Sequence, residues 1–185
     1  MARISLDQPR TLFVRLTDWY SRRTYGTALD PARTTAHQPR VLMSQARFER
    51  SLAKWNKLAP ELKALAVMAS AASIRCSWCI DFGYWDSRRH GMDHRKLHDV
   101  PAWRGSDVYT PLERAVMAYA EAVTATPPAV DDAMVERLRE HLDEAQLVEL
   151  TAMIAVENLR SRVNAALGLT SQGFKDRCDV PQPLG

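Results

Sequence analysis

A long apolar segment runs directly into a pair of closely spaced cysteines, and this feature most constrains the fold. Pro60 opens the segment, because proline is tolerated in the first turn of a helix. Apolar residues cover nearly the whole circumference of the predicted helix: Leu62, Leu65, Ala66, Ala69 and Ala72 on one side, and Ala64, Val67, Met68 and Ala71 on most of the rest. A helix of this kind belongs in a protein interior. The fold must bury it and place Cys76 at its end.

Helical spacing of apolar residues recurs along the chain, and no segment shows the period-two alternation of a half-buried strand. The segment 27–39 is polar and contains proline, so we expect a loop there. We expect short helix and loop over 93–107, and a poorly ordered tail from Thr170. The predicted helices span residues 12–25, 40–55, 60–75, from the cysteines to 90, 111–126, 131–142 and 143–167.

These segments predict an all-α fold, a bundle of about seven or eight helices. The two halves of the chain share a loose plan of capped helix, turn and long buried helix, in which residues 60–73 and 143–159 correspond best. This plan suggests an internal two-fold duplication. We expect three parts: an N-terminal helix and loop at 1–40 that pack on the domain, a helical domain at 41–169, and a tail at 170–185.

Composition excludes several classes of function. The 185 residues are 46% apolar and carry a net charge of +3, with arginines spread along the chain. Nucleic-acid binding needs a dense basic face with aromatic platforms, and neither is present, so we expect no nucleic-acid partner. The sequence has no stretch of 18 apolar residues, so it predicts no membrane span. Residues 1–5 lack the apolar core of a signal peptide. We therefore expect a cytoplasmic protein.

Cys76 and Cys79 form a Cys-x-x-Cys pair at the predicted start of a helix. Backbone N–H groups in the first turn have no helical partner, and the helix dipole is positive there. Both effects favour a thiolate over a thiol. The spacing also lets the two sulfurs approach to disulfide distance within one turn. In a reducing compartment, such a pair is more often redox-active or metal-binding than structural.

Two other interpretations of the pair are open. Both cysteines could be small core residues, since buried cysteine is common. A zinc site would need two more ligands, and His90, His94 and His98 are spaced four apart, but Gly91 interrupts a continuous helix. We therefore expect no metal and no bound cofactor. Cys178 has no partner at a telling distance in the sequence, and we treat it as incidental.

Three aromatic residues follow the pair at helical spacing, Trp78, Phe82 and Trp85. They could line an apolar substrate pocket beside the thiols, or pack in the core or in a subunit contact. Gly83 leaves no side chain one turn above Cys79, where a small cavity, a water or a substrate atom could lie.

Residues 60–67 (PELKALAV) and 71–81 (AASIRCSWCID) resemble the signature of AhpD-like proteins of the carboxymuconolactone decarboxylase family. Residues 112–122 and 149–159 also resemble this family, so the match covers roughly 41–169. The resemblance implies an AhpD-like helical bundle that assembles as a dimer, trimer or hexamer. Redox-active members reduce hydroperoxides through the dithiol, whereas lactone decarboxylases of the family lack it.

The chain departs from the redox-active members at two positions. They carry a glutamate twelve residues before the first cysteine and a histidine four after the second, where this chain has Ala64 and Gly83. The usual proton relay is therefore absent. Candidate replacements are Glu61, one turn before Ala64; Asp81, whose spacing favours Ser77 over Cys79; and Glu157, a carboxylate in the mostly apolar last helix.

These observations predict a thiol-dependent oxidoreductase that reduces hydroperoxides weakly. The resemblance makes Cys79 the attacking residue and Cys76 the resolving one, although helix geometry alone allows the reverse. The expected partners are a small-molecule substrate, a hydroperoxide or another small organic compound, and a reductant, a thiol protein or a small external dithiol. The alternatives are a non-redox decarboxylase-like enzyme using Glu61 or His90, and a binding or assembly module with a degenerate site.

Overall fold

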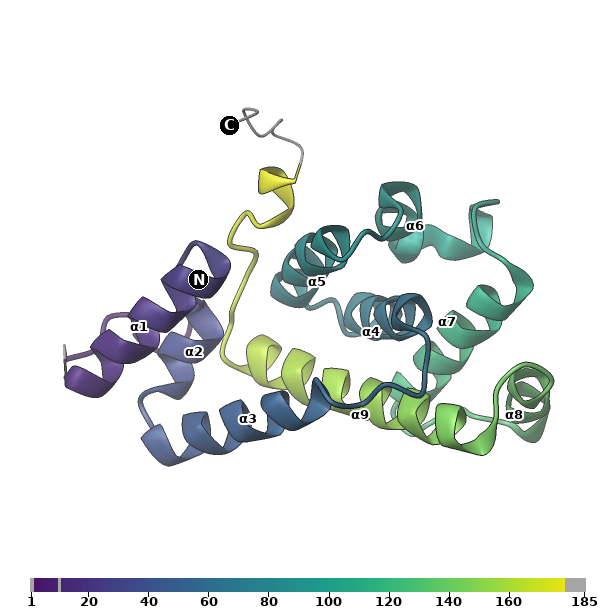
Figure 1. The fold of residues 1–185 in the computed structure, drawn as a ribbon, viewed down its shortest axis with the longest axis horizontal. Helices are drawn as coiled ribbons and strands as arrows, with labels where there is room; N and C mark the ends of the chain where they lie inside the picture. The colour runs from purple at the N-terminus through teal and green to yellow at the C-terminus, as the bar shows by residue number, and fades with distance from the viewer. Residues whose placement is uncertain (1, 10, 179–185) are drawn as a thin grey trace. The chain divides into compact units, whose positions relative to one another are not determined.

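The computed structural model describes residues 2–9 and 11–178, and this part of the chain is helical without strands, as predicted (Figure 1). It contains nine α-helices and two short 3₁₀ helices, one or two α-helices more than expected. The helices are α1 (Leu12–Tyr25), α2 (Asp30–Thr35), α3 (Pro39–Leu52), α4 (Pro60–Ile74), α5 (Ser77–Arg89), α6 (His94–Asp99), η1 (Val100–Gly105), α7 (Pro111–Thr124), α8 (Asp132–Arg139), α9 (Glu144–Ala166) and η2 (Lys175–Arg177).

The prediction of a loop over 27–39 is wrong, because α2 lies within it. The helix has a proline in its first turn, and the Thr34 hydroxyl donates a hydrogen bond to the carbonyl of Pro31 at 3.0 Å. Six residues are too few to show an apolar period, so the pattern gave no signal for this helix.

The chain forms two compact units. One comprises Met1–Trp55 with Asn164–Leu169, and the other Asn56–Val163 with Thr170–Gly185. Within the first unit, α1 ends at Gly26, whose φ of 77° lies in the left-handed region that glycine adopts readily. The Arg3 guanidinium in the same unit donates to the carbonyls of Ala165 and Ala166, each at 2.7 Å.

The second unit is built around α4. Leu65, Ala66 and Ala71 on this helix are fully buried, as its apolar circumference predicts. Figure 1 shows α4 among α5, α7 and α9. Helix α7 contributes Val116, Met117 and Ala120 to the core, and α9 contributes Leu150 and Ile154.

Ion pairs hold the N-terminal end of α4 to its neighbours. The Lys96 ammonium on α6 contacts Glu61 at 2.8 Å and Glu113 on α7 at 2.6 Å. Near the same end, the Lys63 ammonium contacts Glu149 on α9 at 2.5 Å. These contacts fix the N-terminal part of α4, while its C-terminal end leads to the cysteines.

The predicted helix starts are confirmed at α7, α8 and α9. Thr110 and Glu113 form the expected capping box, in which each side chain accepts from the other residue's backbone N–H. The Asp131 carboxylate accepts from the Met134 N–H at 2.8 Å. Asp143 and Gln146 exchange two such bonds, at 2.8 and 2.9 Å.

The C-terminal tail is ordered further than expected. Residues 170–178 are described, Phe174 is fully buried, and 175–177 form η2. The prediction of a poorly ordered tail is therefore wrong over this stretch, because a buried aromatic ring anchors it. Residues 179–185 lie outside the described part.

Among the described residues, we find no helix that is both long enough and apolar enough to cross a membrane.

The capping box gives a stability prediction. Replacing Thr110 by alanine removes the side-chain acceptor for the Glu113 N–H. We expect the free energy of unfolding to fall by about 1 kcal/mol, the usual contribution of an N-cap. Urea denaturation followed by circular dichroism measures the change, with the exposed Thr170→Ala as control. Equal midpoints for both variants would contradict the capping role.

Candidate active site

A sharp reversal of the chain delivers the cysteines to the start of α5. Helix α4 ends at Arg75, whose φ of 62° is in the left-handed region, and the Cys76 N–H then bonds back to the Ala71 carbonyl at 3.0 Å. Cys76 is extended and caps α5, with its sulfur accepting from the Cys79 N–H at 3.2 Å. The predicted position of the pair at a helix N-terminus is confirmed.

Cys76 and Cys79 are joined as a disulfide, with their Cα atoms 5.3 Å apart. The two residues are almost completely buried, at 2% and 7% exposure respectively. The sulfur of Cys76 lies at the N-terminal end of α5 and accepts a hydrogen bond from a first-turn N–H. Both the helix dipole and this hydrogen bond stabilise negative charge on the sulfur. This arrangement can hold either a disulfide or a dithiol with one stabilised thiolate.

Glu61 is not brought to the cysteines. It lies in the first turn of α4, whereas Cys76 follows the last turn, and 15 helical residues span about 22 Å. Its carboxylate is half exposed and pairs with Lys96. His90, the other residue considered for non-redox chemistry, caps the far end of α5 and is largely exposed.

Asp81 is buried on α5, but its carboxylate binds the C-terminal segment. The backbone N–H groups of Gln172, Phe174 and Lys175 donate to it at 2.9, 3.0 and 2.7 Å. Burial raises the pKa of Asp81, but these bonds, with one from the Ser171 side chain, outweigh it and leave the pKa below its usual 3.8. Asp81 therefore serves as an anchor for residues 172–175, in place of the Ser77 contact that its spacing favours.

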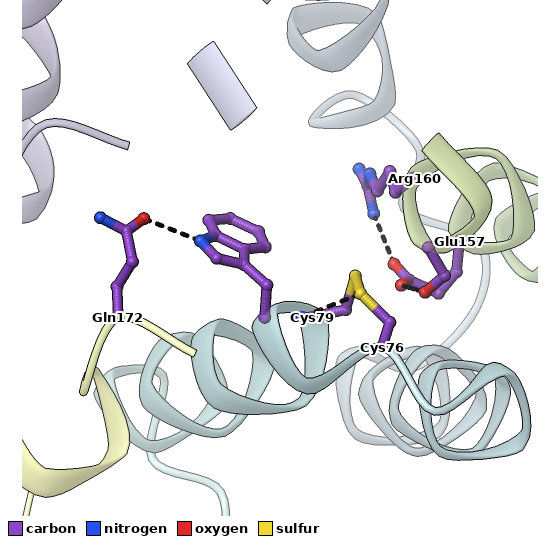
Figure 2. Close-up of a disulfide and its surroundings, with 7 residues drawn as sticks. Cys76, Cys79, Glu157, Arg160 and Gln172 are labelled. Atoms are coloured by element: carbon purple, nitrogen blue, oxygen red, sulfur yellow. Dashed lines mark hydrogen bonds and ion pairs between the residues drawn. A yellow bond between two sulfur atoms is a disulfide. The ribbon is translucent and has the colours of Figure 1, made fainter. Parts of the chain in front are cut away.

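Glu157 is the carboxylate that α9 presents at the dithiol. Figure 2 shows its side chain turned toward the Cys76–Cys79 pair. It is 3% exposed, accepts a hydrogen bond from the Ser161 hydroxyl at 2.6 Å, and lies 3.5 Å from the Arg160 guanidinium. Of the three candidate replacements for the relay, Glu157 is the one whose carboxylate is turned toward the disulfide, since that of Asp81 binds residues 172–175.

The aromatic residues of α5 surround a ring from the C-terminal segment. Phe174 packs against Trp78, Phe82 and Trp85, with ring centroids 6.3, 5.2 and 5.3 Å away. Trp78 also stacks on Phe82 at 5.0 Å. Of the two interpretations of these rings, the contacts with Phe174 favour packing within the protein over an open substrate pocket.

The space above Cys79 at Gly83 is occupied as well. A Cβ atom added to Gly83 would lie 2.6 Å from the sulfur of Met68 on α4. The expectation of a small cavity, water or substrate atom there is wrong, because Met68 fills the volume. A histidine at position 83 would require Met68 to move.

A pocket of about 430 Å³ lies where α4 ends and α5 begins. Its lining residues are Ala72, Ser73, Arg75, Ser77, Ile80, Val100, Pro101 and Glu121. Ser77 is the residue directly after Cys76, so this pocket adjoins the start of the dithiol helix without including either cysteine.

No cluster of three or more His, Cys, Asp or Glu residues that could hold a metal occurs in the described part of the chain. His90 and His94 each lie near a neighbouring aspartate, Asp86 and Asp93 respectively.

Sequence reasoning missed four residues near the site: Met68, Arg160, Gln172 and Phe174. Glu157 and Arg160 share one face at i, i+3 spacing, and this signal could have linked them. Phe174 is a large apolar residue in a polar tail, which is a weak indication of burial. The Met68–Gly83 contact has no signal in a single sequence.

Comparison with known proteins identifies the family to which the chain belongs. The carboxymuconolactone decarboxylase family model matches residues 39–122. The uncharacterized protein YnjA of Escherichia coli K12 is 34% identical over 172 residues, covering 92% of this chain and 93% of YnjA. The chain therefore belongs to the AhpD-like, carboxymuconolactone decarboxylase family, as its motifs indicate.

Solved structures share the fold. A peroxidase-related protein from Ralstonia eutropha JMP134 with an alkylhydroperoxidase AhpD core has a TM-score of 0.82 at 21% identity, covering 98% of each chain. The debrominase Bmp8, in complex with 2,3,4-tribromopyrrole, has a TM-score of 0.80 at 19% identity, covering 96% of this chain and 97% of Bmp8.

The Asp81 anchor predicts a pH-dependent contribution to stability. Because its pKa is lower in the folded state, the contribution is complete above the unfolded value of about 3.8 and is lost as the pH falls through the folded pKa. At pH 7 we expect Asp81→Asn to cost about 2 kcal/mol, since the lost bonds are to a charged group.

Urea denaturation of both proteins at pH 7 and near pH 2.5 measures this difference. The gap between Asp81→Asn and the parent should shrink at the lower pH. A gap that is the same at both pH values would contradict the ionised anchor.

Proposed function

We propose that this protein is a thiol-dependent oxidoreductase whose Cys76–Cys79 pair reduces a hydroperoxide, with Glu157 as the proton acceptor. One observation carries the proposal: a buried carboxylate faces a disulfide-bonded cysteine pair whose first member, Cys76, caps a helix (Figure 2). The family includes redox-active members whose carboxylate and histidine assist the second cysteine. Here the carboxylate comes from α9 instead of α4.

The reaction has two steps that oxidise the dithiol to the disulfide, and a third that reduces the disulfide again. A thiolate attacks the terminal oxygen of the hydroperoxide, so that an S–O bond forms, the O–O bond breaks, and the alcohol leaves after taking a proton. The second thiol attacks the sulfenic sulfur, forming the disulfide and releasing water. An external dithiol then reduces the disulfide by exchange and becomes a disulfide itself.

Glu157 has the surroundings that a proton acceptor needs. Its burial strengthens interactions with a nearby thiol, because the local dielectric constant is low. The Ser161 hydroxyl holds one carboxylate oxygen, and Arg160 lies near the other. These partners keep the carboxylate oriented and leave it able to take a proton when a thiol ionises.

The assignment of roles follows the family, with Cys79 attacking and Cys76 resolving. Cys79 is the more exposed of the two, at 7% against 2%. A reductant that attacks the Cys79 sulfur releases Cys76 as a thiolate. The hydrogen bond from the Cys79 N–H to the Cys76 sulfur stabilises the charge on that thiolate.

A second substrate class is a brominated aromatic ring. Trp78 and Phe82 place aromatic surface on the helix that the dithiol begins, and the debrominase Bmp8 has the same fold. Two thiols would supply two electrons, so that the C–Br bond becomes C–H, hydrogen bromide leaves and the disulfide forms. Bromide release from 2,3,4-tribromopyrrole in the presence of dithiothreitol distinguishes this activity from peroxide consumption.

Serine variants of the two cysteines test the dithiol. We expect Cys79→Ser to lose turnover of cumene hydroperoxide with dithiothreitol, because the attacking thiol is gone. Cys76→Ser should turn over more slowly than the parent, because dithiothreitol must then reduce the sulfenic acid in place of the second cysteine. Without dithiothreitol, Cys76→Ser treated with the hydroperoxide should accumulate sulfenic acid on Cys79, detected by dimedone labelling and mass spectrometry.

A Cys79→Ser variant as active as the parent would reject the proposal. Decarboxylase-like activity that survives replacement of both cysteines by alanine would favour the non-redox alternative. A dithiol without activity toward any of these substrates would favour a binding module.

Replacing Glu157 by glutamine tests the proton acceptor. The change keeps the size and removes the charge, and we expect turnover to fall about 100-fold with a shifted pH profile, as for loss of a general base. Thiolate absorbance at 240 nm should also show a higher pKa for the attacking thiol. The exposed Glu136→Gln on α8 is the matched control. An unchanged pH profile would exclude this role.

A further inference from the structure

The segment after α9 crosses the dithiol helix and binds it at several points. We call residues 170–178 the strap. Its backbone turns at Gly173, whose φ of 71° is left-handed, so that the N–H groups of Gln172, Phe174 and Lys175 converge on Asp81. Further along, the Lys175 ammonium lies 4.8 Å from the ring of Tyr84. Each of these contacts ends on α5.

One strap contact reaches the loop of the disulfide itself. Trp78 lies between the two cysteines in the sequence, and its indole N–H donates to the Gln172 side-chain oxygen at 2.8 Å. Figure 2 shows this bond on the opposite side of the disulfide from Glu157. The ring of Trp78 also contacts Phe174. Any movement of Trp78 therefore acts directly on the strap.

Reduction changes the packing at the start of α5. Opening the disulfide removes the covalent link between the two sulfurs, and the thiols then separate to van der Waals contact. The side chains of Cys76 and Cys79, and the backbone of Ser77 and Trp78 between them, take up this separation. The strap contacts described here are those of the disulfide form.

We propose that the strap is coupled to the redox state of the dithiol through the Trp78–Gln172 hydrogen bond, binding α5 more tightly in the disulfide form than in the dithiol form. Opening the disulfide consumes two electrons and two protons from an external dithiol, and the first turn of α5 then relaxes and loosens residues 172–174. The inference rests on the reversible dithiol of the proposed function, but needs no particular substrate.

Coupling of this kind is reciprocal. If the disulfide strengthens binding of the strap, the strap must stabilise the disulfide by the same factor. The strap thereby lowers the reduction potential of the pair, and its release makes the disulfide easier to reduce. Release of the strap would also uncover the aromatic surface of Trp78, Phe82 and Trp85 that Phe174 now covers.

Hydrogen exchange of the whole protein tests the coupling. The redox state is set with dithiothreitol or its oxidised form and checked by the mass difference of two hydrogens. We expect the amides of Gln172, Phe174 and Lys175 to exchange about tenfold faster in the dithiol form, while the α7 amides of Val116 and Met117 change little. Equal exchange of the three strap amides in the two redox states would overturn the inference.

The potential of a strap variant supplies the reciprocal test. Gln172→Leu removes the acceptor for Trp78 and keeps the bulk, and a tenfold coupling predicts a reduction potential about 30 mV higher than that of the parent. Thr170→Val, at an exposed position of the same segment, is the matched control and should leave the potential unchanged. A Gln172→Leu potential equal to that of the control would also overturn the inference.

These outcomes are separable from failure of the proposed function. A pair that does not cycle reversibly in the redox buffer would reject both the dithiol chemistry and the coupling. A pair that cycles, with strap exchange and potential unaffected, would reject the coupling alone.

Discussion

Burial of α4 is the constraint on which the site depends. Its apolar circumference forces the second unit to form around it, and its N-terminal part is fixed by the ion pairs of Lys96 and Lys63. At the C-terminal end of α4, Arg75 in the left-handed conformation reverses the chain. Cys76 consequently becomes the N-cap of α5 and is almost fully buried. A dithiol in this position has helix N–H groups on one side and the protein core on the other.

The site is assembled from three segments that are distant in sequence. Helix α5 supplies the cysteines and aromatic rings, α9 supplies Glu157 with Arg160 and Ser161, and residues 172–175 close over Asp81 and Trp78. The two acidic residues have different roles because their surroundings differ. Backbone N–H groups saturate Asp81 and bind it to the strap, whereas Glu157 faces the sulfurs with a hydroxyl and a guanidinium beside it (Figure 2).

This arrangement also explains how the family's usual relay positions can be lost. The histidine position is Gly83, and the Met68 sulfur fills the space that a side chain would need. The glutamate position is Ala64, which packs against the core cluster of the second unit. Neither Ala64 nor Gly83 can exchange a proton. In our proposal, the carboxylate of Glu157 on α9 exchanges the proton with the cysteine pair instead.

The sequence by itself determined the all-α class, most helix bounds and the position of the dithiol. Local rules suffice for these features: apolar periodicity marks α4, Thr110 with Glu113 marks the start of α7, and Gly26, Gly91 and Gly168 mark helix ends. Only the tertiary structure decided which of Glu61, Asp81 and Glu157 faces the cysteines. It also decided that Met68 occupies the space at Gly83 and that Phe174 anchors the tail. The reason is physical: caps and periods act within a few residues, whereas these contacts join segments up to 94 residues apart and depend on how whole helices pack.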